Sequence, residues 1–122
     1  MDIQTALKEA LQIQGAIGAC LVDYESGMAL GTLGDEKALN LEVAAAGNTE
    51  VVRAKMRTME SLGLDDSIED ILITLGTQYH LIRPLSTVKD ASLFIYLALD
   101  RKQANLAMAR LGLKRIEGEI TI

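Results

Sequence analysis

Few residues in this sequence have the types and spacing that catalysis requires. Cys20 is the single cysteine and His80 the single histidine, so a disulfide within the chain and a histidine-rich metal site are both excluded. Cys20 lies in an apolar run with no acid or base near it in sequence, which favours a buried, inert thiol over a nucleophile. For His80 we favour a structural or surface role over use as a general base.

Charged residues offer two other chemistries. The carboxylates between residues 65 and 70 could hold a divalent ion, but the segment lacks the glycine and the spacing of a calcium loop, so a solvated turn is favoured. Arg53 and Arg57, one helical turn apart, could contact a phosphate or act as an arginine finger; pairing with Glu50 and Glu60 on a helix surface is favoured instead. No Gly-x-x-x-x-Gly-Lys phosphate loop is present. We therefore expect no catalytic residues, no metal and no cofactor.

The composition limits the kinds of binding partner and the cellular compartment that we expect. The 122 residues carry 17 Asp and Glu against 12 scattered Lys and Arg, a net charge of −5, which disfavours binding to nucleic acid or to an anionic membrane surface. No apolar segment reaches the roughly 18 residues that a transmembrane helix needs. With its one cysteine in an apolar run, the chain is expected to be a single-domain cytoplasmic protein.

The segment 36–62 is the element around which the others must be arranged. As a helix it would be roughly 39 Å long. One apolar stripe has the spacing of a face that packs on a core, and consists of Ala38, Leu41, Ala45, Val52, Met56 and Met59. A second, smaller stripe consists of Val43, Gly47, Val51 and Ala54. Because a small domain cannot cover both stripes of so long a helix, we favour a second copy of the chain over a loop of the same chain as the cover of the second stripe.

Two further helices and five strands account for the rest of the chain. Helices are expected at 2–13 and after Asp100, where Gln103 would complete a capping box and where the apolar face would comprise Ala104, Ala107, Met108 and Leu111. Strands are expected at 16–22, 28–33, 68–75, 78–85 and 91–99, with a polar turn at 86–90. Residues 116–122 form a short tail that is expected to be loose.

The order of these elements is α-β-β-α-β-β-β-α, and their connections are short enough for antiparallel neighbours. The runs 16–22 and 91–99 are apolar without alternation, which is typical of strands covered on both faces, so they are placed side by side in the middle. This predicts an α/β fold: a five-stranded antiparallel sheet of order 2-1-5-4-3, with the long helix on one face and the terminal helices on the other.

In this order the third strand lies at an edge, and an exposed edge recruits another strand unless it is protected. Two copies could join their third strands, continue the sheet and bring their long helices together. The predicted dimer interface consists of Val43, Gly47, Val51, Ala54, Ile71 and Ile73.

Several segments resemble one known family, the roadblock/dynein light-chain domain. They are Gly15-Ala-Ile-Gly-Ala-Cys-Leu-Val-Asp23, Gly27-Met-Ala-Leu30, the long helix, Ile71-Leu-Ile-Thr-Leu75 and Tyr79-His-Leu-Ile-Arg-Pro-Leu85. The resemblance covers residues 2–115 and implies a single domain over 1–115. It also implies a homodimer or heterodimer that shares one sheet and serves Ras-like small GTPases as a regulator or scaffold, as in prokaryotic members of the family.

The resulting hypothesis is a non-enzymatic, homodimeric interaction module for a Ras-like small GTPase. A small-ligand sensor or an adaptor without a GTPase partner is the alternative, because a sheet flanked by helices can open an apolar pocket. A small enzyme that uses Cys20 or His80 is the third possibility.

Overall fold

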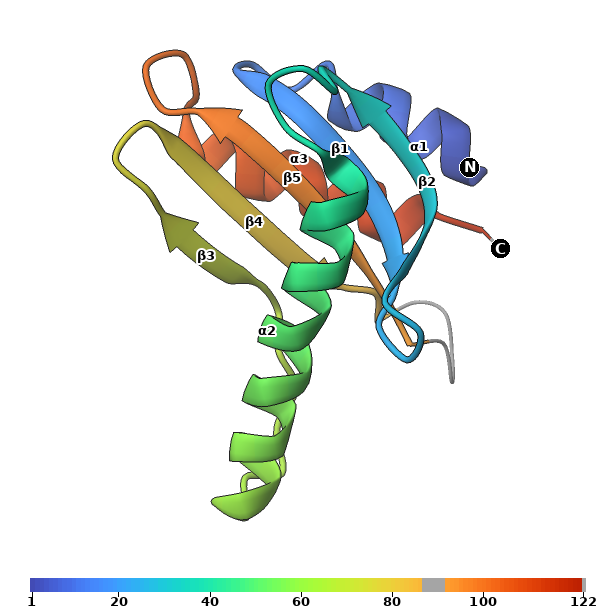
Figure 1. Cartoon of the computed structure of the whole chain (residues 1–122), viewed down its shortest axis with the longest axis vertical. Coiled ribbons are helices and arrows are strands. Elements are labelled where there is room, and N and C mark those ends of the chain that lie inside the picture. The colour runs from blue at the N-terminus through green and yellow to red at the C-terminus, as the bar shows by residue number, and fades with distance from the viewer. Residues whose placement is uncertain (87–91, 122) are drawn as a thin grey trace.

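A computed structural model describes residues 1–86 and 92–121 of the chain. Three helices and five strands follow one another in the predicted order (Figure 1): α1 Ile3–Ala10, β1 Ala16–Asp23, β2 Met28–Gly34, α2 Leu41–Ser61, β3 Ile71–Thr74, β4 Gln78–Pro84, β5 Leu93–Asp100 and α3 Leu106–Glu119. The sheet is antiparallel with the order β2-β1-β5-β4-β3, which confirms the predicted topology. The predicted turn at 86–90 lies almost wholly outside the described residues.

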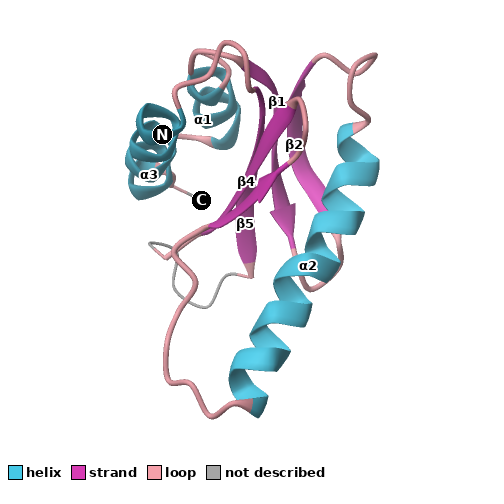
Figure 2. Cartoon of the chain, turned by 90° about the vertical axis from the view of Figure 1, so that its left-hand side faces the viewer, coloured by secondary structure: helices cyan, strands magenta, loops and turns pink. Residues whose placement is uncertain are grey.

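The two unbroken apolar runs form the centre of the sheet, as predicted. In β5 every residue from Leu93 to Leu99 is buried, and β1 is buried along most of its length. Both strands are apolar on both faces because helices cover both faces. Figure 2 shows α2 on one face, with α1 and α3 together on the other. Two apolar clusters follow from this layering, one on each side of the sheet.

One end of the β1–β2 hairpin depends on glycine. Gly34 has φ of +143° and pairs with Gly18 on β1. A Cβ atom built on Gly34 would lie 2.5 Å from the Cα of Gly18, a distance that no real side chain tolerates. The two strands can therefore approach this closely only because position 34 lacks a side chain.

The long helix begins five residues later than predicted. Asn40 caps it, accepting a hydrogen bond from the backbone N–H of Val43 at 3.1 Å. Asp35, which directly precedes the predicted helix 36–62, caps a separate turn instead: its carboxylate accepts from the N–H of Lys37 at 3.0 Å and its carbonyl from the N–H of Leu39. The helix is therefore about 32 Å long, and its C-terminal half extends beyond the sheet (Figure 1).

The buried side of α2 differs from the predicted stripe at four positions: Ala38, Thr49, and also Met56 and Met59, which are only half-buried. Leu41, Ala45 and Val52 are buried as expected, but Ala38 is exposed because it precedes the helix. Thr49, which belongs to neither predicted apolar stripe, is buried, and its hydroxyl donates to the carbonyl of Ala45 at 2.8 Å. A threonine can be buried in a helix when its hydroxyl is satisfied in this way.

The last helix corrects three expectations. It begins at Leu106 with Asn105 as its cap, whereas Asp100 closes a preceding turn by accepting from Gln103 and Ala104. The predicted apolar face is wrong, since Met108 and Leu111 are 61% and 62% exposed. The side that packs on the sheet consists of Ala109, Leu113, Ile116 and Glu117.

The segment expected to be a loose tail continues this helix. Residues 116–119 belong to α3, and Ile120 after it is buried in the core. Thr121 donates its backbone N–H to the carbonyl of Met1 at 2.8 Å, which ties the two ends of the chain together. Within the described part of the chain, no helix is both long and apolar enough to cross a bilayer.

Candidate functional site

The six residues of the predicted dimer interface lie on two neighbouring elements. On α2, Val43 is 66% exposed, Gly47 and Ala54 are exposed, and Val51 is half-buried. A Cβ atom on Gly47 would meet nothing within 4 Å, so this part of the helix surface is open. On β3, Ile71 and Ile73 are half-buried and, like Val51, border the apolar cluster between α2 and the sheet.

The position of α2 leaves part of the sheet incompletely covered. The helix packs mainly on β1 and β2, and β3 lies to one side of it (Figure 1). Ile71, Ile73 and His80, which face the α2 side from β3 and β4, are only half-buried. The same region thus contains an exposed apolar stripe on a helix and a partly open apolar surface on the sheet.

The outer edge of β3 is unpaired within the described part of the chain. The strand has four residues and pairs only with β4. Of the acidic residues that precede it, Asp70 is engaged in a two-fold contact with Arg110, with nitrogen to oxygen distances of 2.9 and 3.1 Å. We call the α2 stripe Val43, Gly47, Val51 and Ala54, together with Ile71 and Ile73 of β3, the α2/β3 surface.

A polar network lies on the same side of the sheet. The Nε2 atom of His80 is 2.7 Å from Oε1 of Gln78, and its Nδ1 atom is 3.1 Å from the hydroxyl of Tyr96. If Nε2–H donates to Gln78 and the Tyr96 hydroxyl donates to Nδ1, a neutral His80 is satisfied at both nitrogens. Burial lowers the pKa of His80 and so favours this neutral form.

Cys20 is buried on the central strand β1. Burial raises the pKa of its thiol to about 12, and the charges of Glu42 and Glu36 contribute to the same shift. The thiol is therefore protonated at neutral pH and a poor nucleophile. The structure gives Cys20 and His80 the environment of structural residues.

The remaining charged candidates are Arg53, Arg57 and the acidic segment 65–70. Arg53 and Arg57 are exposed on α2. In the acidic segment 65–70, Asp66 accepts from the backbone N–H of Ser67 at 2.8 Å, and Asp70 pairs with Arg110. Among the described residues, no three His, Cys, Asp or Glu side chains are grouped as a metal site would require.

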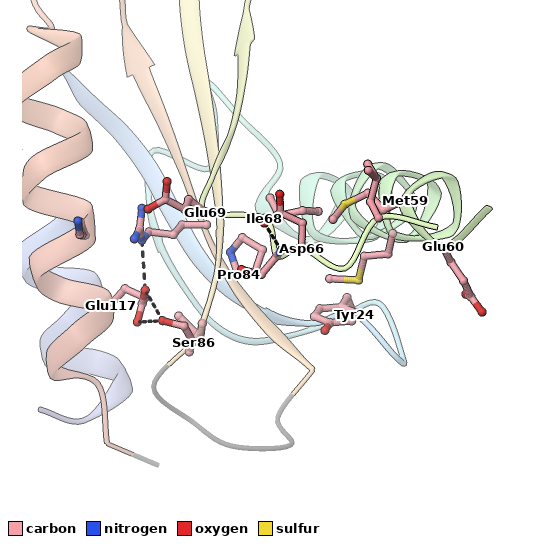
Figure 3. Close-up of a pocket in the computed structure, with 15 residues that line it drawn as sticks. Tyr24, Met59, Glu60, Asp66, Ile68, Glu69, Pro84, Ser86 and Glu117 are labelled. Carbon is pink, nitrogen blue, oxygen red and sulfur yellow. Dashed lines mark hydrogen bonds and ion pairs between the residues drawn. The ribbon is translucent and has the colours of Figure 1, made fainter. Parts of the chain in front are cut away.

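A cleft of about 710 Å³ lies where the sheet ends between α2 and α3 (Figure 3). Met56 and Met59, assigned to the core from the sequence, are half-buried and line it from α2. On the opposite side Arg83 of β4 and Glu117 of α3 form a buried ion pair, with Nε and Oε1 3.2 Å apart. The Ser86 hydroxyl donates to the same carboxylate at 3.2 Å.

Sequence reasoning missed this cleft because its walls come from segments far apart in the chain. One signal was present: the alternation of β4 places Arg83 on the same face as Leu81 and Leu85. A cation on a buried face needs a partner. The partner could not be identified, because Glu117 falls in the segment expected to be a tail.

Comparisons with known proteins show the fold. No protein-family model and no curated protein matches the sequence. Among solved structures, a Roadblock/LC7 domain from Streptomyces avermitilis superposes with a TM-score of 0.79 at 11% identity, covering 96% of this chain and 92% of that one. A structure of MglB with a tetrameric arrangement gives 0.78 at 19% identity, with 94% and 82% covered.

The gliding protein MglB from Thermus thermophilus is also similar, with a TM-score of 0.70, 20% identity, and coverage of 96% of this chain and 89% of that one. These superpositions confirm, at the level of the fold, the resemblance that the sequence motifs indicate. With its sheet order, its three helices and nearly its whole length matched, the chain has the fold of a Roadblock/LC7 domain.

Proposed function

We propose that this chain is a non-enzymatic, homodimeric interaction module that regulates or scaffolds a Ras-like small GTPase. The observation that carries the proposal is the α2/β3 surface: an apolar helix stripe beside a half-covered part of the sheet and a short strand whose outer edge is unpaired among the described residues. The roadblock family, which the sequence resembles, supplies regulators and platforms for such GTPases.

Self-association would satisfy both parts of this surface at once. Joining β3 to β3 of a second copy pairs the free backbone groups of the edge, which is the usual reason that exposed strands recruit partners. The same arrangement brings the two α2 helices together near the joined edges. Val43, Val51 and Ala54 could then bury apolar area against the second copy, at about 25 cal/mol per Å². The tetrameric arrangement of the similar MglB structure supports self-association in proteins of this fold.

A regulatory or scaffolding role needs no catalytic group on the chain, which agrees with the environments of Cys20 and His80. The Cys20 thiol is buried and protonated, and His80 is engaged at both ring nitrogens. Any hydrolysis would take place on the GTPase, which the dimer could stabilise in one conformation by binding it more tightly in that state.

Nucleotide-dependent capture tests this function. The immobilised chain would be incubated with each Ras-like GTPase encoded in the same genome, loaded with GDP or with a non-hydrolysable GTP analogue. We expect one GTPase to be retained at least ten-fold more in one nucleotide state, which corresponds to about 1.4 kcal/mol of differential binding. Retention of none of them, or equal retention in both states, would refute GTPase regulation.

A further inference from the structure

The cleft in Figure 3 is separate from the α2/β3 surface, since none of the six residues of that surface lines it. A second hollow of about 390 Å³ adjoins it, sharing the lining residues Glu69, Arg83 and Lys114 and reaching Leu111 on α3. We call the two neighbouring hollows together the groove; its lining extends from the methionines of α2 to Leu111 of α3. An open, elongated groove suits a segment of polypeptide better than a compact molecule.

The α2 end of the groove is apolar and adaptable. Met56 and Met59 line it from the helix, and Leu64 and Ile68 line it from the loop that follows. Leu64 is 52% exposed, so the loop presents its apolar side chain to solvent instead of burying it. Methionine side chains have three rotatable bonds and a polarisable sulfur, which lets a surface accommodate different apolar side chains.

The charges along the groove are mostly negative. Arg83 is paired with Glu117, and Arg110 with Asp70, so these four side chains largely neutralise one another. Among the described residues, the other charged ones that line the groove are Glu60, Asp66, Glu69 and Lys114, three acids against one base.

The end of α2 makes this potential more negative. Its last turn contains Glu60 and no basic residue. The carbonyl groups at the C-terminus of a helix carry a partial negative charge, so a cation is normally favoured there. A cationic side chain of a partner would therefore be attracted by the helix terminus and by Glu60 together.

From these observations we infer that the groove docks an extended segment of a partner protein in which apolar side chains alternate with Lys or Arg. An apolar side chain of the segment lies against Met56 and Met59, and its cations lie beside Glu60, Asp66 and Glu69. This second docking site does not depend on the identity of the GTPase or on self-association.

The test uses a fluorescein-labelled ten-residue peptide of alternating leucine and lysine, with a peptide of alternating leucine and glutamate as its counterpart. Fluorescence anisotropy should show the basic peptide binding at least ten-fold more tightly. Removing two groove carboxylates with the double variant Glu60→Gln, Glu69→Gln should weaken it about five- to ten-fold, the effect of two surface charge contacts. The control double variant Glu25→Gln, Glu36→Gln changes the net charge equally at exposed positions outside the groove and should weaken binding less than two-fold.

The apolar end is tested in the same assay. Met59→Gln should weaken binding several-fold, whereas Met28→Gln, at a position that is 68% exposed on β2, should leave it unchanged. If the groove variants and their controls lose the same amount of affinity for the peptide, the attraction is to an acidic chain in general and not to the groove. If the peptide does not bind at all, no such segment docks. Either result refutes the proposal. Binding of a small apolar dye that the peptide does not displace would assign the cleft to small molecules instead.

Failure of this proposal and failure of the proposed function are distinguishable. The peptide should bind equally well to Val43→Glu, a variant of the α2/β3 surface outside the groove. Light scattering and circular dichroism on each groove variant should give the mass and the helix content of the unmodified chain, because all substituted side chains are exposed or half-buried.

Discussion

The guanidinium group of Arg83 on β4 is paired with the carboxylate of Glu117 on α3, with Nε and Oε1 3.2 Å apart and the two side chains only 10% and 4% exposed. The pair links the sheet to the last turns of the C-terminal helix. Ser86 adds a hydroxyl that donates to the same carboxylate. Together with the burial of Ile116 and Ile120, this contact holds the chain beyond residue 115 against the sheet.

Breaking this pair should destabilise the fold. Glu117→Leu removes the carboxylate that neutralises Arg83, and the free energy of unfolding should fall by about 3 kcal/mol because a buried charge loses its partner. In the double variant Arg83→Met, Glu117→Leu the free energy of unfolding should fall much less, because neither charge remains buried without a partner. Urea denaturation of both variants measures the difference.

An exposed ion pair on the same helix provides the control. Arg110→Met breaks the pair with Asp70. Because the side chains of Arg110 and Asp70 are 44% and 18% exposed, the free energy of unfolding should fall by less than about 1 kcal/mol. If Glu117→Leu were as mild as Arg110→Met, the buried pair would not hold α3 in place.

The order of the strands could be predicted because it depends on local signals. Two runs apolar on both sides mark the central strands, and short turns require antiparallel neighbours. The alternation in β4 also follows from the period of two in a strand: Tyr79 and Leu81 face α1 and α3, whereas Ile82 faces α2.

The ends and the buried faces of the helices were less predictable, because the sequence offers more than one capping residue and more than one apolar face. Asp35 and Asn40 are both good caps, and both are used, the first for a turn and the second for α2. In α3, small and apolar residues occur on every side, so the sequence offers two faces; the structure buries Ala109 and Leu113 and exposes Met108 and Leu111. The choice is made by tertiary packing, which a helical wheel does not contain.

The titration of His80 should make stability depend on pH. Burial lowers the pKa of His80 below its ordinary value of 6.5, so near this value the unfolded chain binds more protons than the folded one. The free energy of unfolding should therefore decrease as the pH is lowered from about 7.5 to 5.5. His80→Gln should flatten this part of the curve.

The pKa of Asp2 is lowered by its hydrogen bond from Thr5, and the stability that this provides is lost only as the pH falls below about 3.8. The two effects thus occupy different pH ranges. Equal slopes above pH 5 for His80→Gln and the unmodified chain, measured by urea denaturation, would show that His80 titrates normally.

Cys20 should be unreactive in the folded protein. With the thiol buried and its pKa raised to about 12, almost no thiolate is present at pH 8. Iodoacetamide should label it on the order of 100-fold more slowly than in urea, where the group is hydrated and its pKa returns to an ordinary value. Because Cys20 is the single cysteine, mass spectrometry of the whole chain is a direct readout. Equal rates in both conditions would mean that β1 opens readily.

Self-association through the α2/β3 surface is the claim on which the proposed function depends most. Val43→Glu and Ala54→Glu place a charge at the two ends of the exposed stripe. Both positions are exposed, and an acid at position 43 lies in the first turn of α2, where negative charge is favourable, so the fold should be kept. Met28→Glu, on the exposed start of β2, is the matched control.

Light scattering on the purified chain is the most direct measurement. We predict twice the chain mass of 13.2 kDa for the unmodified protein and for Met28→Glu, and the mass of one chain for Val43→Glu and Ala54→Glu. A single-chain mass for the unmodified protein, or an unchanged double mass for both stripe variants, would contradict pairing through α2 and β3.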